Sequence, residues 1–251
     1  MTADVLRIRA DNPGPYTLSG TNTWVAGRDP AWVVDPGPAL DAHLDAVAAE
    51  VRKRGGAGGI AITHDHPDHV EGVAGLVERL DGPPVYAVRY EGATERIGDG
   101  DAVGPLRAMA LPGHAPDHVV FLWERVCFAG DAVLGEGSVF IAPDPGGLKG
   151  YLDGLRRLRA LDLELICPGH GPEIHDVAGK LDEYVAHRLD RERRLVAALD
   201  AGVRGEAALL DAVWDDVPAA LRGAAAVTLA AHLAKLREEG RLGEDPVADP
   251  P

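Results

Sequence analysis

Four candidate metal ligands lie within six residues of the sequence: His64, His66, Asp68 and His69. Imidazole is the commonest metal ligand in proteins, and the chemistry of an ordinary polar turn does not explain three imidazoles so close together. In an extended segment alternate residues point the same way, so His64 and His66 can face one metal ion. The segment therefore predicts a metal site.

This histidine-rich segment lies between an expected strand and an expected helix. Residues 59–62 are apolar and partly β-branched, which is typical of a buried strand. Residues 69–80 carry valine and leucine at helical spacing, which predicts a helix. The chain turns at Pro67, and the start of the helix directs Asp68 and His69 towards a second position close to the first. One strand-to-helix turn can thus serve two neighbouring metal positions.

Three later segments repeat the arrangement of a strand followed by a turn that carries a ligand-type residue. His114 follows an expected strand at 106–111, Asp131 follows one at 126–129, and His170 follows one at 163–167. Each signal is weak alone, since a single Gly-Asp pair after a strand is more often just a turn. Loops held by a rigid sheet are where binding residues concentrate, so four such loops together are a strong pattern.

Composition limits the classes of function. The chain has 251 residues, 46% of them hydrophobic, so it can bury a substantial core. Its net charge of −15 argues against general nucleic-acid affinity, although a local basic channel stays open. Cys127 and Cys167 lie in apolar runs and are expected to be buried, reduced thiols. No apolar signal core begins the chain and no long apolar run occurs, which predicts a cytoplasmic protein without membrane contact.

Strands and helices alternate only loosely along the chain. Hairpins are expected near both ends of the first 200 residues, and this mixture favours two mixed sheets with helices outside over a doubly wound parallel sheet. Helices are predicted at 40–54, 148–161 and 177–199. The remaining strands are predicted at 22–27, 31–35, 85–88 and 119–123.

The candidate ligands resemble the metal-binding signature of the metallo-β-lactamase fold superfamily. The pattern His64-x-His66-x-Asp68-His69, followed by His114, Asp131 and His170, matches all seven ligand positions. A finer resemblance, to the subgroup typified by beta-lactamase-like protein 2, spans most of the chain, and glyoxalase II is more distant. The resemblance implies an α/β fold, a four-layer αββα sandwich, with a small C-terminal winged-helix-like α module.

The same resemblance implies roles for the ligands. His64, His66 and His114 would bind one metal ion, Asp68, His69 and His170 the other, and Asp131 would bridge them. Nitrogen and oxygen ligands in this number suit two zinc ions per chain, with iron or manganese as alternatives. Asp35 resembles a carboxylate that orients a ligand histidine, or else it caps the turn before Pro36. His118 could lie behind the ligands or make an ordinary structural hydrogen bond.

A dinuclear centre of this kind predicts a metal-dependent hydrolase. A metal-bridging hydroxide would cleave an ester, thioester or related acyl bond of a small molecule, with Asp68 as the catalytic residue that handles the leaving-group proton. The alternatives are a single-strand endoribonuclease, a ligand-sensing regulator and an iron-dependent persulfide oxygenase. RNA cleavage would need a basic channel, which only residues 156–159 and 188–194 could supply. We expect residues 188–194 to form a solvated helix face, and His43 and His232 to lie on helix faces.

The sequence divides into a metal-hydrolase domain at 1–200, a winged-helix-like module at 201–243 and a tail at 244–251. Within the module, residues 206–214, 218–221 and 225–239 are expected to be helical, and residues 241–242 could begin a short strand. From residue 202 onwards five basic side chains face nine acidic ones, a net charge of −4 and the wrong sign for a phosphate backbone. We therefore expect the module to pack on the metal domain or join a homodimer, and not to read DNA.

Overall fold

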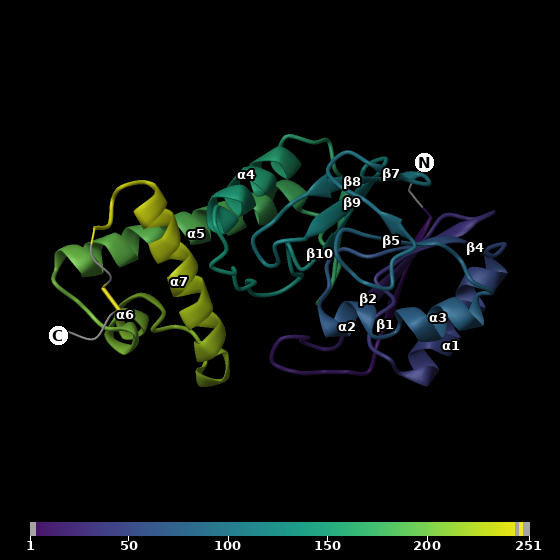
Figure 1. Ribbon diagram of the computed structural model, residues 1–251, viewed down its shortest axis with the longest axis horizontal. Helices are drawn as coiled ribbons and strands as arrows, with labels where there is room; N and C mark the ends of the chain where they lie inside the picture. The colour runs from purple at the N-terminus through teal and green to yellow at the C-terminus, as the bar shows by residue number, and fades with distance from the viewer. Residues whose placement is uncertain (1–3, 244–245, 248–251) are drawn as a thin grey trace.

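The computed structural model describes residues 4–243, 246 and 247, and it contains two β-sheets with helices outside them (Figure 1). The first sheet contains, in spatial order, β1 (Val5–Arg9), β2 (Asn22–Ala26), β3 (Ala31–Val34), β4 (Ala57–Ala61), β5 (Val85–Ala87) and β6 (Glu95–Arg96). The second contains β11 (Leu165–Pro168), β10 (Val126–Gly130), β9 (Val119–Trp123), β8 (Leu106–Ala110) and β7 (Ala102–Val103).

Both sheets are mixed, as the sequence predicted. In the first sheet β1, β2 and β3 pair antiparallel, while β3 through β6 pair parallel. In the second sheet β10 and β11 pair parallel, and the other neighbours pair antiparallel. The short strands β6 and β7 lie in a polar stretch that gave no strand signal.

Because β4, β8, β10 and β11 each end near one side of the molecule, the loops that follow them can converge.

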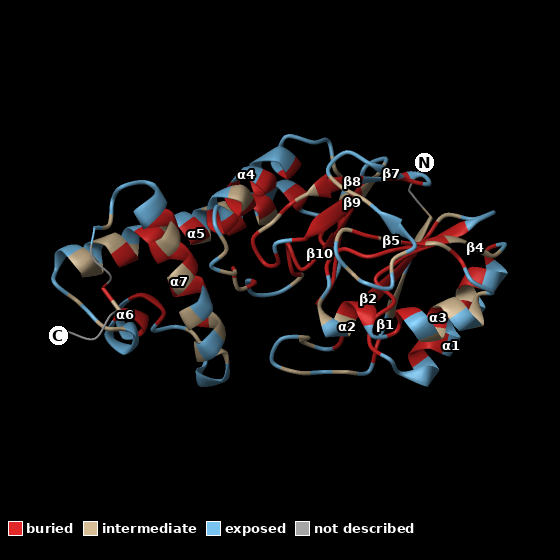
Figure 2. Cartoon of the chain, viewed as in Figure 1, coloured by how far each residue is buried: buried red, intermediate tan, exposed pale blue. Residues whose placement is uncertain are grey.

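Helices cover the outer face of each sheet and produce four layers. The helices α1 (Asp41–Lys53), α2 (Pro67–Val70) and α3 (Val73–Arg79) pack on the first sheet, and α4 (Gly147–Arg159) and α5 (Val177–Asp200) pack on the second. A third apolar cluster lies between the sheets and includes Trp24, Phe121 and Phe128. Figure 2 shows the buried residues concentrated along these shared faces. The predicted four-layer αββα sandwich is confirmed.

The helix expected at 69–80 is two helices, α2 and α3. The break falls at Gly72, whose N–H donates to the Gly37 carbonyl at 2.9 Å. A Cβ at this position would lie 2.8 Å from Leu44 and 2.9 Å from the Gly37 oxygen, so only glycine lets α1 approach so closely. The prediction was wrong because the periodic valines conceal this contact between elements.

The C-terminal module contains α6 (Glu206–Val213), the 3₁₀ helix η1 (Ala219–Leu221) and α7 (Arg222–Glu238). Its apolar cluster includes Leu195, so α5 extends from the second sheet into the module, as Figure 1 shows. Residues 241–243 form no strand, and the short strand expected at 241–242 is therefore wrong for the described part of the chain. Residues 244–245 and 248–251 of the expected tail lie outside the described residues, whereas Pro246 accepts a hydrogen bond from the Gly205 N–H at 2.8 Å.

Two further expectations concern buried and membrane-spanning residues. Cys127 and Cys167 are both buried and free, as predicted. Burial raises the pKa of the Cys127 thiol far above its usual range, so it is unreactive at neutral pH. Among the described residues, no helix has the length and apolarity that a membrane crossing needs.

Candidate metal centre

Four loops meet where the two sheets abut. Backbone hydrogen bonds join the sheets at this point: the Val119 N–H donates to the Thr63 carbonyl at 2.9 Å, and the Asn22 N–H donates to the Gly169 carbonyl at 2.7 Å. The Asn22 side chain also donates to the carbonyls of Pro168 and Gly171, at 3.0 and 2.9 Å. The Thr63 contact holds the loop after β4 against the end of the loop after β8, and the Asn22 contacts hold the start of β2 against the loop after β11.

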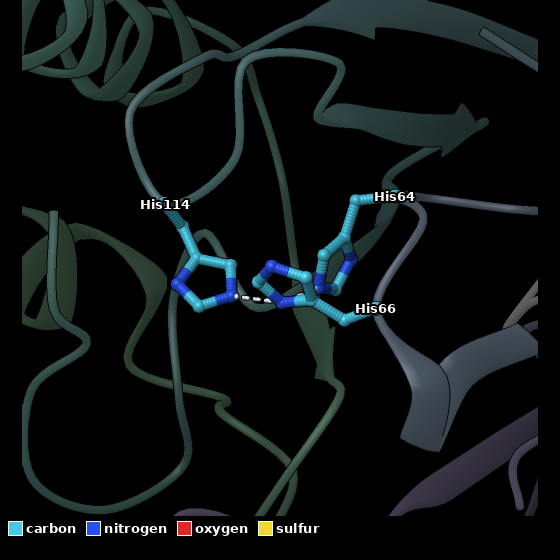
Figure 3. A group of neighbouring side chains, drawn as sticks. All are labelled: His64, His66 and His114. Carbon is cyan, nitrogen blue, oxygen red and sulfur yellow. Dashed lines mark hydrogen bonds between the residues drawn. The ribbon is translucent and has the colours of Figure 1, made fainter. Parts of the chain in front are cut away.

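Three histidines form one tight group. His66 Nδ1 lies 3.0 Å from His64 Nε2 and 2.9 Å from His114 Nε2 (Figure 3). A neutral imidazole carries a single N–H, so these three nitrogens have few protons to share among several close contacts. Their lone pairs converge on one small volume, and together they could hold a metal ion.

A second group lies beside the first. His170 Nε2 is 3.2 Å from Asp68 Oδ2, and His69 Nε2 is 3.5 Å from the same oxygen. Asp131 lies between the two groups: its Oδ1 is 3.5 Å from His69 Nε2, and its Oδ2 is 3.3 Å from His170 and 3.7 Å from His114. The structure thus brings all seven predicted ligand residues together.

The polar atoms of this cluster are arranged better as ligands of a metal ion than as hydrogen-bond partners of one another. His69 Nε2 and Asp131 Oδ1 are buried and have no hydrogen-bond partner among the residues that the structure describes. Buried polar atoms are rarely left so, because each one costs free energy. A set of imidazole nitrogens and carboxylate oxygens is the usual environment of zinc or iron. The donor set therefore suits two neighbouring cations.

Asp35 supports the second group from behind. Its Oδ2 lies 2.9 Å from His69 Nδ1, and it accepts hydrogen bonds from the Thr63 N–H and hydroxyl, each at 2.8 Å. Asp35 is buried and adopts a positive φ of 53°, which is rare for a residue other than glycine. The structure places this carboxylate where it orients a ligand-type histidine, which favours that role over simple turn capping. Thr63, which no sequence motif marked, contacts Asp35 and also lies 2.9 Å from His64 Nδ1.

His118 packs behind the first group. Its ring stacks on His64 with centroids 4.8 Å apart, and its Nε2 accepts a hydrogen bond from the Asp131 N–H at 3.2 Å. This second contact fixes the start of the loop that carries Asp131. His118 is therefore a support for the cluster and not a member of it.

The charge of the cluster is divided between its two groups. Burial lowers the pKa of His114 to about 4, so this imidazole is neutral near pH 7. Burial opposes ionisation of Asp68, but the hydrogen bond from His170 and the charges of His69 and His170 together outweigh it and lower the pKa of Asp68 to about 2. Asp131 outweighs the effect of burial on His170 and raises its pKa to about 9. A metal ion competes with protons for the lone pairs of these side chains. The second group, which contains the ionised Asp68, is therefore where a cation gains the most binding free energy.

Comparison with known proteins decides the family. The profile described as the Metallo-beta-lactamase superfamily matches residues 16–105 and 93–170, and that of the Beta-lactamase associated winged helix domain matches residues 206–246. The chain belongs to the metallo-β-lactamase superfamily. Membership makes it a metallo-hydrolase and confirms the predicted superfamily, fold and C-terminal winged-helix module.

Individual members of the superfamily resemble this chain along most of its length. The beta-lactamase-like protein 2 homolog of Caenorhabditis elegans is 35% identical over 257 residues, covering 94% of this chain and 85% of the relative. A beta-lactamase domain protein from Burkholderia ambifaria superposes with a TM-score of 0.80 at 21% identity, over 97% of this chain and 89% of that one. The protein TTHA1623, solved in a di-iron-bound form, superposes with a TM-score of 0.56 at 28% identity, over 69% and 96%.

A cavity of about 400 Å³ adjoins the metallo-β-lactamase centre. His114 and Asp131 lie at one part of its wall, and Trp214, Pro218 and Leu221 of the C-terminal module lie at another. The module also contacts the metal domain directly, since the Ile141 N–H donates to Thr228 Oγ1 of α7 at 3.2 Å. The winged-helix module thus packs on the metal domain and supplies part of the wall beside the candidate metal centre.

Several helix residues that we expected to be solvated are buried. Arg188 is 2% exposed and Arg191 is 4% exposed, so the segment 188–194 is not simply a solvated helix face. Both arginines lie on the buried face of α5 together with Leu181, Tyr184 and Leu195. Their helical spacing with these apolar residues indicates burial, but the acidic residues between them in the sequence suggested a solvated face. His43 and His232 lie on helices α1 and α7, as expected, on the buried faces of those helices. His43 Nε2 lies 2.9 Å from the Thr23 hydroxyl and 3.1 Å from the Pro36 carbonyl.

Proposed function

We propose that this metallo-hydrolase is a dinuclear enzyme that cleaves an ester, thioester or related acyl bond of a small molecule. The observation that carries the proposal is the cavity of about 400 Å³ that adjoins His114 and Asp131. Its volume is in the range of small-molecule sites, and most of its wall is apolar. A substrate whose reacting carbonyl lies at the cluster would place the rest of its acyl chain in this cavity.

The seven clustered side chains would hold two cations. His64, His66 and His114 form one position, Asp68, His69 and His170 form the other, and Asp131 lies between them. Two zinc ions suit this set, and iron is the alternative that the di-iron form of TTHA1623 supports. When bound, such a pair supplies an activated water near neutral pH and polarises the carbonyl under attack.

Asp68 is the side chain that we assign to proton handling. Its carboxyl group is partly exposed, at 29%, and its Oδ2 accepts a hydrogen bond from the Thr21 hydroxyl at 3.2 Å. It is ionised near neutral pH, so it can accept a proton from the attacking water and hold it beside the leaving group. Thr21 keeps the carboxylate facing the cluster through this hydrogen bond.

The surface charges support a small-molecule substrate over RNA. Five arginines of the two segments that could have formed a basic channel are paired with carboxylates. In the first segment Arg156 is paired with Asp153, Arg157 with Asp99, and Arg159 with Asp182. On α5, Arg193 is paired with Asp190 and Arg194 with Asp215. Neutralised arginines contribute little to binding a phosphate backbone.

Metal analysis combined with a substrate panel tests the proposal. We expect close to two metal ions per chain, and turnover of a thioester or ester with kcat/KM well above any rate on RNA. Replacing the central carboxylate, Asp131→Ala, should abolish hydrolysis and reduce the metal content while circular dichroism stays unchanged. Full activity in this variant, or one metal ion at full occupancy, would contradict a dinuclear centre.

The same panel separates the other candidate functions. If the protein cleaves single-stranded RNA and hydrolyses no acyl substrate, the reaction is phosphodiester hydrolysis and the proposed acyl hydrolysis is wrong. Oxygen-dependent consumption of a persulfide by an iron-loaded sample would make the protein an oxygenase. Tight ligand binding without turnover of any substrate would make it a regulator.

A further inference from the structure

The cavity beside the metal centre contains a buried arginine whose charge faces no carboxylate in the described part of the chain. Arg188 lies on α5 and lines the cavity together with Tyr184, Val139 and Phe140. Its side chain is 2% exposed, so it gains little from bulk water. The metal ligands His114 and Asp131 line the same cavity, so a single small molecule could contact both them and Arg188.

The contacts of Arg188 within the protein leave its charge uncompensated. Its Nη2 donates to Ser138 Oγ at 2.7 Å and to the Val139 carbonyl, both neutral acceptors. Its Nε is buried without a hydrogen-bond partner, and its Cζ lies 5.8 Å from the centre of the Tyr151 ring. Among the residues that the structure describes, no carboxylate lies within ion-pair distance of this guanidinium.

The neighbouring charged residues of the cavity are already neutralised. Arg191, one turn further along α5, contacts both carboxylate oxygens of Asp216 at 2.7 Å. Glu183 is paired with Lys180 at 3.1 Å. Asp131 faces His69 and His170. Among the described residues of the cavity wall, Arg188 therefore keeps a charge that is available for a ligand.

An arginine in this position keeps its proton. Burial lowers the pKa of Arg188, but a guanidinium starts from a value so high that it stays charged at neutral pH. Removing a cation from water without an anion is costly, and a bound anion would repay that cost. The planar guanidinium matches a carboxylate in shape and can donate two parallel hydrogen bonds to it.

We propose that Arg188 binds a carboxylate of the substrate, so that this enzyme acts on acyl compounds carrying a second, anionic group away from the scissile bond. The inference rests on the proposed acyl hydrolysis, whose reacting carbonyl would lie at the metal centre. Between the two ends, Val139, Phe140 and Leu134 offer an apolar wall. The fitting substrates are thus esters or thioesters with a short apolar chain that ends in a carboxylate.

Matched substrates measure the preference. Succinyl, glutaryl and adipyl thioesters of N-acetylcysteamine are compared with neutral acyl thioesters of the same carbon number. The acetyl thioester of 3-mercaptopropionate places the carboxylate on the leaving group instead, and the acetyl thioester of N-acetylcysteamine is its neutral counterpart. We expect the metal-loaded full-length protein to prefer one carboxylate series on the order of 10- to 100-fold in kcat/KM, as one buried charge-assisted contact allows.

Three variants test whether Arg188 causes the preference for carboxylate substrates. Arg188→Met removes the charge and keeps the length, so the ratio of kcat/KM for carboxylate over neutral substrates should fall to about one. Arg188→Lys keeps the positive charge but lacks the planar guanidinium that donates two parallel hydrogen bonds, so it should retain part of the preference. Arg193→Met removes an exposed arginine of the same helix and should behave as wild type. Equal preference in wild type and Arg188→Met, or no preference in wild type, would overturn the proposal.

A binding measurement distinguishes failure of this proposal from failure of the proposed function. If wild type hydrolyses no acyl substrate, the function fails, and the anion site is judged by how much glutarate raises the melting temperature of the full-length protein. The site stands if glutarate stabilises Arg193→Met and not Arg188→Met, and falls if both respond equally. Should Arg188→Met not fold, Arg188→Lys and the wild-type substrate preference decide.

Discussion

The imidazole of His69 and the carboxylate of Asp35 lie 2.9 Å apart, and both side chains are buried. Asp35 also accepts two hydrogen bonds from Thr63, and these hold its carboxylate in position independently of its contact with His69. The contact holds His69 Nδ1 and leaves its Nε2 facing Asp68 and Asp131. A carboxylate placed behind a ligand histidine in this way orients the ring and raises its basicity.

The first prediction follows from this contact. Asn tolerates the positive φ of position 35 and can still accept a hydrogen bond from the Thr63 N–H, but its amide nitrogen cannot accept a hydrogen bond from His69 Nδ1. Asp35→Asn should therefore keep the fold and weaken metal binding by about 10- to 100-fold. Competition with a chelator of known affinity, followed by metal analysis, measures the change. Unchanged metal affinity would mean that Asp35 serves the turn alone.

A second prediction concerns a glycine that contacts the cluster. A Cβ on Gly169 would lie 2.4 Å from Asp131 Oδ1 and 2.8 Å from His69 Cε1, closer than real Cβ atoms come to other atoms. Its φ is not in the left-handed region, so Gly169→Ala tests crowding alone. We expect loss of metal content and of activity, with most of the fold retained.

The matched control for that variant is Gly223→Ala. Gly223 lies in α7, where an added Cβ meets nothing within 4 Å. Alanine is preferred to glycine in a helix by up to about 1 kcal/mol, so this variant should be slightly more stable and fully loaded with metal. A Gly169→Ala protein that also binds metal normally would show that the loops after β10 and β11 can shift to make room.

The ligand loops could be predicted from the sequence because their signals are local. A histidine or aspartate directly after a strand is visible in the sequence, and the ends of neighbouring strands meet at one side of a sheet. Thr63 and Gly72 gave no such signal, because their roles depend on elements distant in the sequence. Thr63 contacts Asp35, which follows β3, and Gly72 contacts helix α1. Arg188 was misread because the acids around it on α5 suggest surface pairing, while its burial depends on how the C-terminal module packs.

A third prediction concerns pH and the buried His232 of α7. Burial lowers the pKa of His232 to about 3, whereas an unfolded histidine titrates near 6.5. Between these values the unfolded chain binds a proton that the folded chain does not, so stability is complete above about pH 6.5 and falls as the pH decreases. The loss should be roughly 1.4 kcal/mol per pH unit, or about 2 kcal/mol at pH 5.

His232→Leu isolates that effect. Both ring nitrogens of His232 lack a hydrogen-bond partner, so leucine removes no hydrogen bond. The groups that disfavour its protonation, Arg188 and Lys235 first among them, remain in the variant. Urea unfolding at pH 7.5 and pH 5.0 should show a smaller acid loss in the variant than in wild type. Equal losses would place the acid sensitivity in other groups, since both proteins share the same metal centre.

The last prediction is that the winged-helix module does not bind DNA. Its basic side chains are already engaged: Lys235 lies 2.7 Å from both Glu192 and Glu239, and Arg241 lies 2.8 Å from Glu192. Arg222 donates to Asp211, and Lys235 is also largely buried between α7 and α5. A phosphate backbone would have to displace these carboxylates from a module whose net charge is already negative.

Fluorescence anisotropy with a labelled duplex, at 50 and 200 mM salt, tests this on the full-length protein. We expect no saturable binding at micromolar protein in either buffer. Glu192→Gln leaves Lys235 and Arg241 without one shared carboxylate, and it should loosen α7 from α5 and lower the melting temperature without creating DNA affinity. Binding by wild type that weakens tenfold or more between the two salt concentrations would assign the module to DNA, because such salt dependence reports phosphate contacts.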